Sequence, residues 1–315
     1  MRRKHSFNFA MASFVATAAM LAAVPAHSGG PGAPREVTPN ADGHGFASVY
    51  GGIPSDQAEF LSTPDSIRSA AASGAPTLVW EALEHGEKVE CLDCVAGVSR
   101  LLYDSNAKNR EIAAWWLRRR VFGVFGSGEV YEQTIRTLQG DPDPLRRAYA
   151  ASALGEFFLL PGISACSQAV TIDADARVRS AAATALGRLN DEGVAGALGH
   201  ALADADAGVK LAALGAAARI NAFSGLSAVA GLTMDATVDV RRRAIEVLDA
   251  LDARDAVAPV AAAAQNDVDA RVRAEACHAL GTFGDPTATP VLMKIVRTDP
   301  DALVRDLAQS ALLRL

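Results

Sequence analysis

An all-α solenoid, made of stacked pairs of helices, is the fold class that this sequence predicts. The main observation is a pattern that begins with Asp and recurs along the chain, at Asp141, Asp173, Asp204, Asp235, Asp267 and Asp299. The successive spacings are 32, 31, 31, 32 and 32 residues, and a fixed period of about 20 to 50 residues is the signature of a solenoid. A second observation is that each unit contains two apolar segments separated by a turn. Each unit is therefore expected to be a helix, a short turn and a second helix.

The longer apolar segment of each unit follows a basic residue that lies six places after the Asp. Small or apolar side chains occur three, four, six and seven residues beyond this basic residue, which places them on one face of a helix. The residue three places beyond it is Ala every time, and a position that accepts only a methyl group is one where two helix backbones come close. These residues are Ala150, Ala182, Ala213, Ala244, Ala276 and Ala308. We expect this face to be buried between neighbouring helices.

The repeated Asp and the basic residue form a pair in every unit, for example Asp173 and Arg179. An Asp at the start of a helix accepts hydrogen bonds from free backbone N–H groups and lies near the positive end of the helix dipole. We therefore interpret the Asp as the cap of the second helix. The basic residue is then a donor to the Asp or to the turn carbonyl groups of its neighbour. The alternative is a basic stripe that binds a ligand.

The first repeat, Val89 to Gly126, departs from the pattern. Alignment of Arg110 with the later basic residues puts Ala at the all-Ala position, but it requires a spacing of 37 residues from Asp104 to the next repeated Asp. Terminal repeats are normally atypical because they cap the core. In this alignment Trp116 lies on the buried face and Trp115 points away from it.

The repeated residues resemble a known family. The pattern D-x-x-x-x-V-R-x-x-A-x-x-A-L-G, at 31 to 32 residues, is similar to HEAT repeats, specifically the short phycobilisome-lyase-like type. The resemblance covers Ser127 to Leu315 well and extends more loosely back to Glu90. It implies a right-handed superhelix of about seven repeats that serves mostly as a protein interaction surface. Some members are cofactor lyases, and one subfamily is an iron-dependent hydroxylase with His-Glu pairs, which this sequence lacks.

The N-terminal part of the chain has the features of a targeting segment and a linker. Residues 1–26 combine basic residues, an apolar stretch and a small-x-small cleavage site, and so predict a secretory signal peptide; the alternative is an uncleaved membrane anchor. Residues 27–62 are rich in Gly and Pro, which is typical of a disordered linker. The solenoid is expected to span residues 63–315, with an atypical capping part at 63–126 and regular repeats at 127–315. Its first two helices are expected at 64–73, where Thr63 is the N-cap, and at 76–85.

The charge and the predicted export limit the classes of partner. Removal of the signal peptide takes three positive charges from a chain whose formal net charge is already −6, and an acidic protein is poorly suited to bind nucleic acid. We expect a periplasmic or secreted protein with no membrane span after cleavage.

Cys91-Leu92-Asp93-Cys94 is the sharpest chemical motif. The next residue is Val95, where attachment of c-type haem requires His. In an exported protein, two nearby cysteines commonly form a disulfide, although residues three apart in a helix are farther apart than an ordinary disulfide allows. Such a bond would be strained or would lie at a helix end. Reduced core thiols, or a metal site that includes His85, are the alternatives, and we expect no metal. Cys166 and Cys277 are interpreted as small core residues.

A binding surface is expected on the second helices, which the resemblance places on the concave side of the solenoid. Positions two, five and nine after the basic residue point away from the buried face. The larger side chains at these positions are Trp115, Arg119, Tyr149, Glu156, Arg188, Arg219, Arg243, Glu246, Glu275 and His278. An exposed Trp beside Arg is typical of binding hot spots, so the N-terminal end of this strip is the preferred site; ordinary solvated surface is the alternative.

The function predicted is that of a non-enzymatic, exported scaffold or adaptor that binds a protein partner and has no cofactor. No catalytic constellation is found: there is no G-x-S-x-G and no H-E-x-x-H. The alternative is a cofactor-handling or thiol-redox assembly protein that uses Cys91 and Cys94 and is related in function to lyases.

Overall fold

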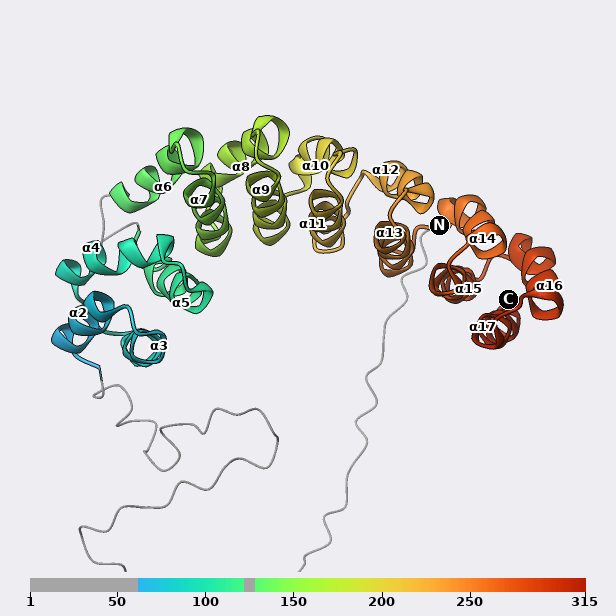
Figure 1. The fold of residues 1–315 in the computed structure, drawn as a ribbon, viewed down its shortest axis with the longest axis horizontal. Helices are drawn as coiled ribbons and strands as arrows, with labels where there is room; N and C mark the ends of the chain where they lie inside the picture. Colours follow the sequence, from blue (N-terminus) through green and yellow to red (C-terminus); the bar gives the residue numbers. More distant parts are fainter. Residues whose placement is uncertain (1–61, 122–127) are drawn as a thin grey trace, which may run out of the picture. The chain divides into compact units, whose positions relative to one another are not determined.

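The computed structural model describes residues 62–121 and 128–315, and within these ranges the chain forms sixteen α-helices, short 3₁₀ turns and no β-strand (Figure 1). The predicted signal peptide and nearly all of the predicted linker lie outside the described residues. In the part of the chain that is described, no helix has the length and hydropathy needed to cross a membrane.

The first two helices begin and end where the sequence predicts. Helix α2 spans Pro64–Ser73, and Thr63 caps it by accepting a hydrogen bond from the N–H of Ser66 at 3.2 Å. Helix α3 spans Pro76–His85 and stops at Gly86. They are followed by α4 (Leu92–Arg100), the 3₁₀ turn η1 (Leu101–Tyr103) and α5 (Ala107–Leu117).

The regular repeats follow as alternating first and second helices. The first helices are α6 (Glu129–Gly140), α8 (Pro161–Ile172), α10 (Ala195–Leu202), α12 (Leu226–Gly231), α14 (Val257–Asn266) and α16 (Thr289–Thr298). The second helices are α7 (Pro144–Phe157), α9 (Ala176–Leu189), α11 (Ala207–Ala217), α13 (Val238–Ala250), α15 (Ala270–Phe283) and α17 (Ala302–Leu312). Each second helix packs against the next second helix, and each first helix against the next first helix, so these repeats form two layers.

The predicted buried face is the observed one. All six alanines at the all-Ala position, and Ala113 in the first repeat, are fully buried. Trp116 is also fully buried, and its indole N–H donates to the carbonyl of Gly86 at 2.8 Å. The alignment of the first repeat on Arg110 is supported, because its Nη1 donates to the turn carbonyl of Asp104, as the later arginines do in their own turns.

The closest approach between second helices occurs at glycine, near the C-terminal end of α7, α9 and α15. A Cβ atom added to Gly187 would lie 2.6 Å from Cα of Ala216 on α11, and the same atom on Gly155 or Gly281 would lie 2.8 Å from an alanine Cα of the next second helix. Such distances are below any ordinary contact, so these positions require glycine. In the last unit the equivalent residue is Leu313, which is 81 % exposed.

An ion pair joins each regular unit to the next. Nε and Nη2 of Arg179 donate to the two carboxylate oxygens of Asp204 at 2.7 and 2.9 Å, while Nη1 donates to the carbonyl of Asp173 in its own turn at 2.9 Å. The complete set of pairs is Arg147–Asp173, Arg179–Asp204, Lys210–Asp235, Arg241–Asp267 and Arg273–Asp299. Every one of these side chains is 17 % exposed or less. We call this set the inter-repeat ladder.

The capping role predicted for the repeated Asp is wrong by two residues. Asp173 is the C-cap of the first helix α8, and its carboxylate accepts the N–H of Asp175 at 2.9 Å. Asp175 is the N-cap of the second helix and accepts the N–H of Arg177. The carboxylate of the first Asp can therefore form an ion pair with the Arg of the preceding unit. The donor role predicted for the basic residue is confirmed.

The ladder carboxyls make stability depend on pH. The hydrogen bond from Arg179 lowers the pKa of Asp204 against the opposing effect of burial. For Asp173, Asp235, Asp267 and Asp299, burial alone would raise the pKa, but hydrogen bonds from the basic side chain and the backbone outweigh it and lower the pKa. A carboxyl with a lowered pKa in the folded state stabilises that state above its unfolded pKa of about 3.9, and this stabilisation is lost as the pH falls through the folded value.

Gly187→Ala is expected to lower the stability of the protein by about 1 to 3 kcal/mol, because the new methyl group meets the backbone of α11. Gly215→Ala is the matched control. Gly215 also lies third from the end of a second helix, and a Cβ there meets nothing within 4 Å. This control should stabilise by about 0.5 to 1 kcal/mol, the usual gain from Ala in a helix. Denaturant midpoints of both variants would measure this; a shift in the same direction for both would contradict the packing described here.

Asp204→Asn is expected to cost about 2 kcal/mol at pH 7, between the values for an exposed and a buried ion pair, because it leaves Arg179 without its carboxylate. The variant should also lose less stability than the wild type when the pH is lowered from about 4 to about 2. Thermal melts followed by circular dichroism across this range would test it. Asp252→Asn, in the exposed pair with Arg254, is the control and should change little. Equal losses in the two variants would mean that the ladder contributes no more than a surface pair.

Candidate functional site

At the N-terminal end of the predicted strip, Arg119 is exposed as expected and Trp115 is less exposed than expected. Trp115 is half-buried against the core, and the guanidinium that lies over its ring, at 5.6 Å, belongs to Arg118. Arg119 lies beyond the end of α5 and donates instead to the carboxylate of Glu87 at 2.9 Å. The structure therefore does not join Trp115 and Arg119 into the single hot spot expected from the sequence.

Three other residues of the strip do come together. Tyr149 and Glu156 on α7 and Arg188 on α9 line one cavity of about 250 Å³ between α5, α7 and α9. The carboxylate of Glu156 pairs with the guanidinium of Arg188 across the two helices. We call this space the α5–α7–α9 cavity.

Helix α5 contributes side chains to this cavity that sequence reasoning missed. They are Ala107, Arg110, Glu111 and Ala114, and Trp115 is not among the lining residues. Arg110 lies over the ring of Tyr149, with its guanidinium carbon 3.9 Å from the ring centre. The regular helices contribute as expected, since Ser152 and Thr184 stand at position five after the basic residue and also line the cavity. That signal was present in the sequence, but only the larger side chains were selected from it.

Among the charged side chains that line the cavity, Arg188 has a shifted pKa. Burial lowers the pKa of Arg188, the positive charge of Arg219 lowers it further, and Glu111 opposes both effects. Arg219 itself is exposed just beyond the end of α11. The cavity thus offers an aromatic ring, two carboxylates and guanidinium groups within a small volume, which is a surface suited to polar groups of both charges.

The remaining residues of the strip form a second cluster on α13 and α15. Glu246 accepts from Arg242 and from Arg243, the latter at 3.0 Å. Nε2 of His278 lies 3.6 Å from a carboxylate oxygen of Asp249, a pair that is ionic only when the histidine is protonated. Burial raises the pKa of Glu275, and repulsion by Glu246 adds to this shift. Glu246 and His278 are thus paired within this cluster, while the other carboxylate oxygen of Asp249 is buried and has no hydrogen-bond partner.

The two close cysteines form a disulfide in the structure, with 5.3 Å between their Cα atoms. Cys91 is the N-cap residue of α4 and Cys94 lies in its first turn, so the bond occupies a helix end. Cys166 and Cys277 are buried thiols within the repeats. Among residues 62–121 and 128–315, no three His, Cys, Asp or Glu side chains are grouped in a way that could hold a metal ion.

Comparison with known proteins supports the fold. The family model of HEAT repeats matches residues 226–313. The X-ray structure of YibA from E. coli is similar, with a TM-score of 0.55 and 19% identity over 82% of this chain and 94% of that chain. Kap95p, solved with RanGDP, gives a TM-score of 0.59 and 14% identity over 80% of this chain and 41% of that chain.

A further solved structure is less similar. The complex of CpcE and CpcF of phycocyanin lyase from Nostoc sp. PCC7120 has a TM-score of 0.39 and 21% identity over 70% of this chain and 86% of that chain. No curated protein sequence matches the chain. The repeat period, the two layers of helices and the similar solved structures agree with one another: the chain is an α-solenoid of helix pairs, of which residues 226–313 match the HEAT-repeat model.

Proposed function

We propose that this protein is a non-enzymatic scaffold that binds another protein through the surface of its second helices. The observation that carries the proposal is the α5–α7–α9 cavity, where side chains from three successive second helices converge. Binding energy at protein interfaces is concentrated in a few residues that fill pockets, with Tyr and Arg strongly enriched. Tyr149 and Arg188 are residues of this kind, and each is held in place by a neighbour.

The repeat architecture supports the same proposal. Each unit of a solenoid contacts only its neighbours, which produces a long continuous surface rather than a single closed pocket. The resemblance to HEAT repeats implies that the second helices line the concave side. We further propose that the protein acts in the periplasm or outside the cell, because of the signal-peptide pattern of residues 1–26.

The alternative, a cofactor-handling or thiol-redox protein, is favoured by one observation. The Cys91–Cys94 disulfide lies at the N-terminal end of a helix, where a thiolate is stabilised. This second activity is compatible with a scaffold, since a solenoid could hold the protein on which the cysteines act.

Tyr149→Ala combined with Arg188→Ala is expected to weaken partner binding by about thirtyfold or more, since loss of a hot spot costs about 2 kcal/mol. The full chain would first be used to capture and identify partners from the cell envelope of the producing organism, and the affinity of the purified partner would then be measured for each variant. Arg136→Ala combined with Arg297→Ala, two exposed side chains on first helices, is the control.

The outcomes separate three surfaces. If the Tyr149→Ala and Arg188→Ala variant binds with full affinity and the Arg136→Ala and Arg297→Ala control binds weakly, the binding site lies on the first helices. If only a Trp115→Ala and Arg119→Ala variant loses affinity for the partner, the binding site includes Trp115 and Arg119 and not the α5–α7–α9 cavity. Melting temperatures of all variants would exclude unfolding as the cause.

A further inference from the structure

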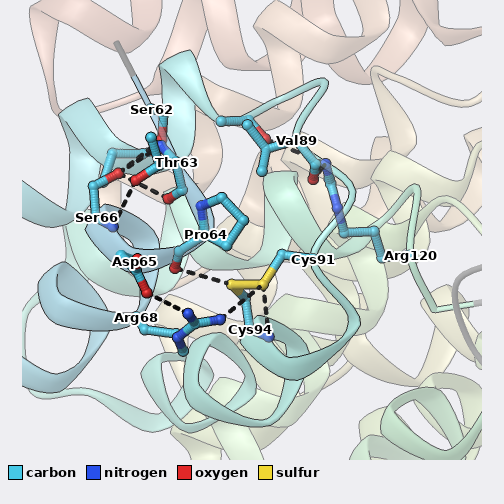
Figure 2. Close-up of a disulfide and its surroundings, with 12 residues drawn as sticks. Ser62, Thr63, Pro64, Asp65, Ser66, Arg68, Val89, Cys91, Cys94 and Arg120 are labelled. Carbon is cyan, nitrogen blue, oxygen red and sulfur yellow. Dashed lines mark hydrogen bonds and ion pairs between the residues drawn. A yellow bond between two sulfur atoms is a disulfide. The ribbon is translucent and has the colours of Figure 1, made fainter. Parts of the chain in front are cut away.

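The two sulfur atoms of the Cys91–Cys94 disulfide have different neighbouring groups (Figure 2). Cys91 Sγ accepts the backbone N–H of Cys94 at 3.1 Å, and Nη1 of Arg68 on α2 lies 3.8 Å from the same sulfur. These donors come from two separate helices. Both stabilise negative charge on Cys91, because a thiolate is favoured by a helix N-terminus and by a nearby guanidinium.

The surroundings of Cys94 have the opposite effect. Its Sγ lies 3.5 Å from the carbonyl oxygen of Pro64 (Figure 2). A carbonyl oxygen can accept a hydrogen bond from a thiol but cannot donate one to a thiolate. The two environments therefore favour negative charge at the sulfur of Cys91 over negative charge at the sulfur of Cys94.

The pair lies at the edge of the fold. Cys91 is 6 % exposed, but its neighbour Arg68 has a side chain that is 46 % exposed, and Leu92, between the two cysteines, is 60 % exposed. The sulfur of Cys91 therefore lies next to partly exposed side chains, whereas Cys94 is 1 % exposed. The other two thiols differ in kind, since burial raises the pKa of both Cys166 and Cys277 to about 12.

We propose that Cys91 and Cys94 are a redox-active pair that exchanges disulfides with another protein, with Cys91 as the nucleophile and Cys94 as the resolving thiol. The thiolate of Cys91 attacks one sulfur of the partner disulfide, forms a mixed disulfide, and releases the second partner sulfur, which takes up a proton. Cys94 then attacks the sulfur of Cys91 while its proton passes to the departing partner sulfur, which re-forms the Cys91–Cys94 bond and releases the other partner thiol. Two electrons and two protons pass to the partner disulfide. The reverse sequence oxidises a partner dithiol.

Alkylation of the full-length chain by iodoacetamide tests the assignment of the nucleophile. Near pH 6.5, Cys91 in the Cys94→Ser variant should react at least about tenfold faster than Cys94 in the Cys91→Ser variant, since only a thiolate reacts. Arg68→Ala, made in the Cys94→Ser background, should slow the reaction of Cys91 several-fold. Cys166 and Cys277 should remain unmodified in each protein and serve as internal controls. Equal rates for the two single variants would overturn the assignment.

Reduction of insulin by dithiothreitol tests the activity. Insulin supplies a protein disulfide and dithiothreitol the electrons, and the wild type should accelerate the precipitation of reduced insulin, whereas Cys91→Ser and Cys94→Ser should not. Arg68→Ala keeps both cysteines and should be intermediate, so the test survives if either cysteine variant fails to fold. Acceleration by none of the proteins, with normal melting of the wild type, would show that the disulfide is only structural. Neither assay involves the α5–α7–α9 cavity, so negative results in both assays would not contradict the proposed scaffold function.

Discussion

The ion pair between a basic side chain of one repeat and the carboxylate of the next is the interaction on which the regular part of this solenoid depends. The four arginines of the inter-repeat ladder also donate to carbonyl groups of their own turns, as Arg179 does while it pairs with Asp204. A largely buried guanidinium without its carboxylate is costly. Each unit is therefore stabilised by its successor, which gives the nearest-neighbour stability that is characteristic of repeat proteins.

The candidate binding cavity lies where this regularity is interrupted. The spacing between Asp104 and Asp141 is longer than in the later units, and Asp141 pairs with Arg146 of its own unit. Arg110 keeps its bonds to its own turn but, among the described residues, reaches no carboxylate of the next unit; it lies over Tyr149 instead. The same irregularity that breaks the ladder thus supplies a cation and an aromatic ring to the cavity.

The sequence predicted the parts of this structure that depend on local chemistry and on period. Thr63-Pro64 and Gly86 delimit helices because caps, prolines and glycines act within a few residues, and the all-Ala position marks the buried face because its spacing is helical. The prediction assigned the N-cap of the second helix to the wrong Asp, because an Asp-x-Asp turn contains two carboxylates. The sequence does not show which backbone N–H group each carboxylate accepts. The surroundings of Trp115 could not be predicted, because they depend on how α5 is rotated relative to α7. The first repeat is atypical, so the later repeats do not show what this rotation is.

The glycines at the ends of α7, α9 and α15 have a consequence for the spacing of the second helices. Gly155, Gly187 and Gly281 let the next second helix come so close that a Cβ atom would meet its backbone. The equivalent residues after α11 and near the end of α13 are Ala218 and Asp249, and the next second helix packs there as well. A side chain at this position requires a larger separation than glycine does. The separation between neighbouring second helices is therefore set unit by unit, by the residue at this single position.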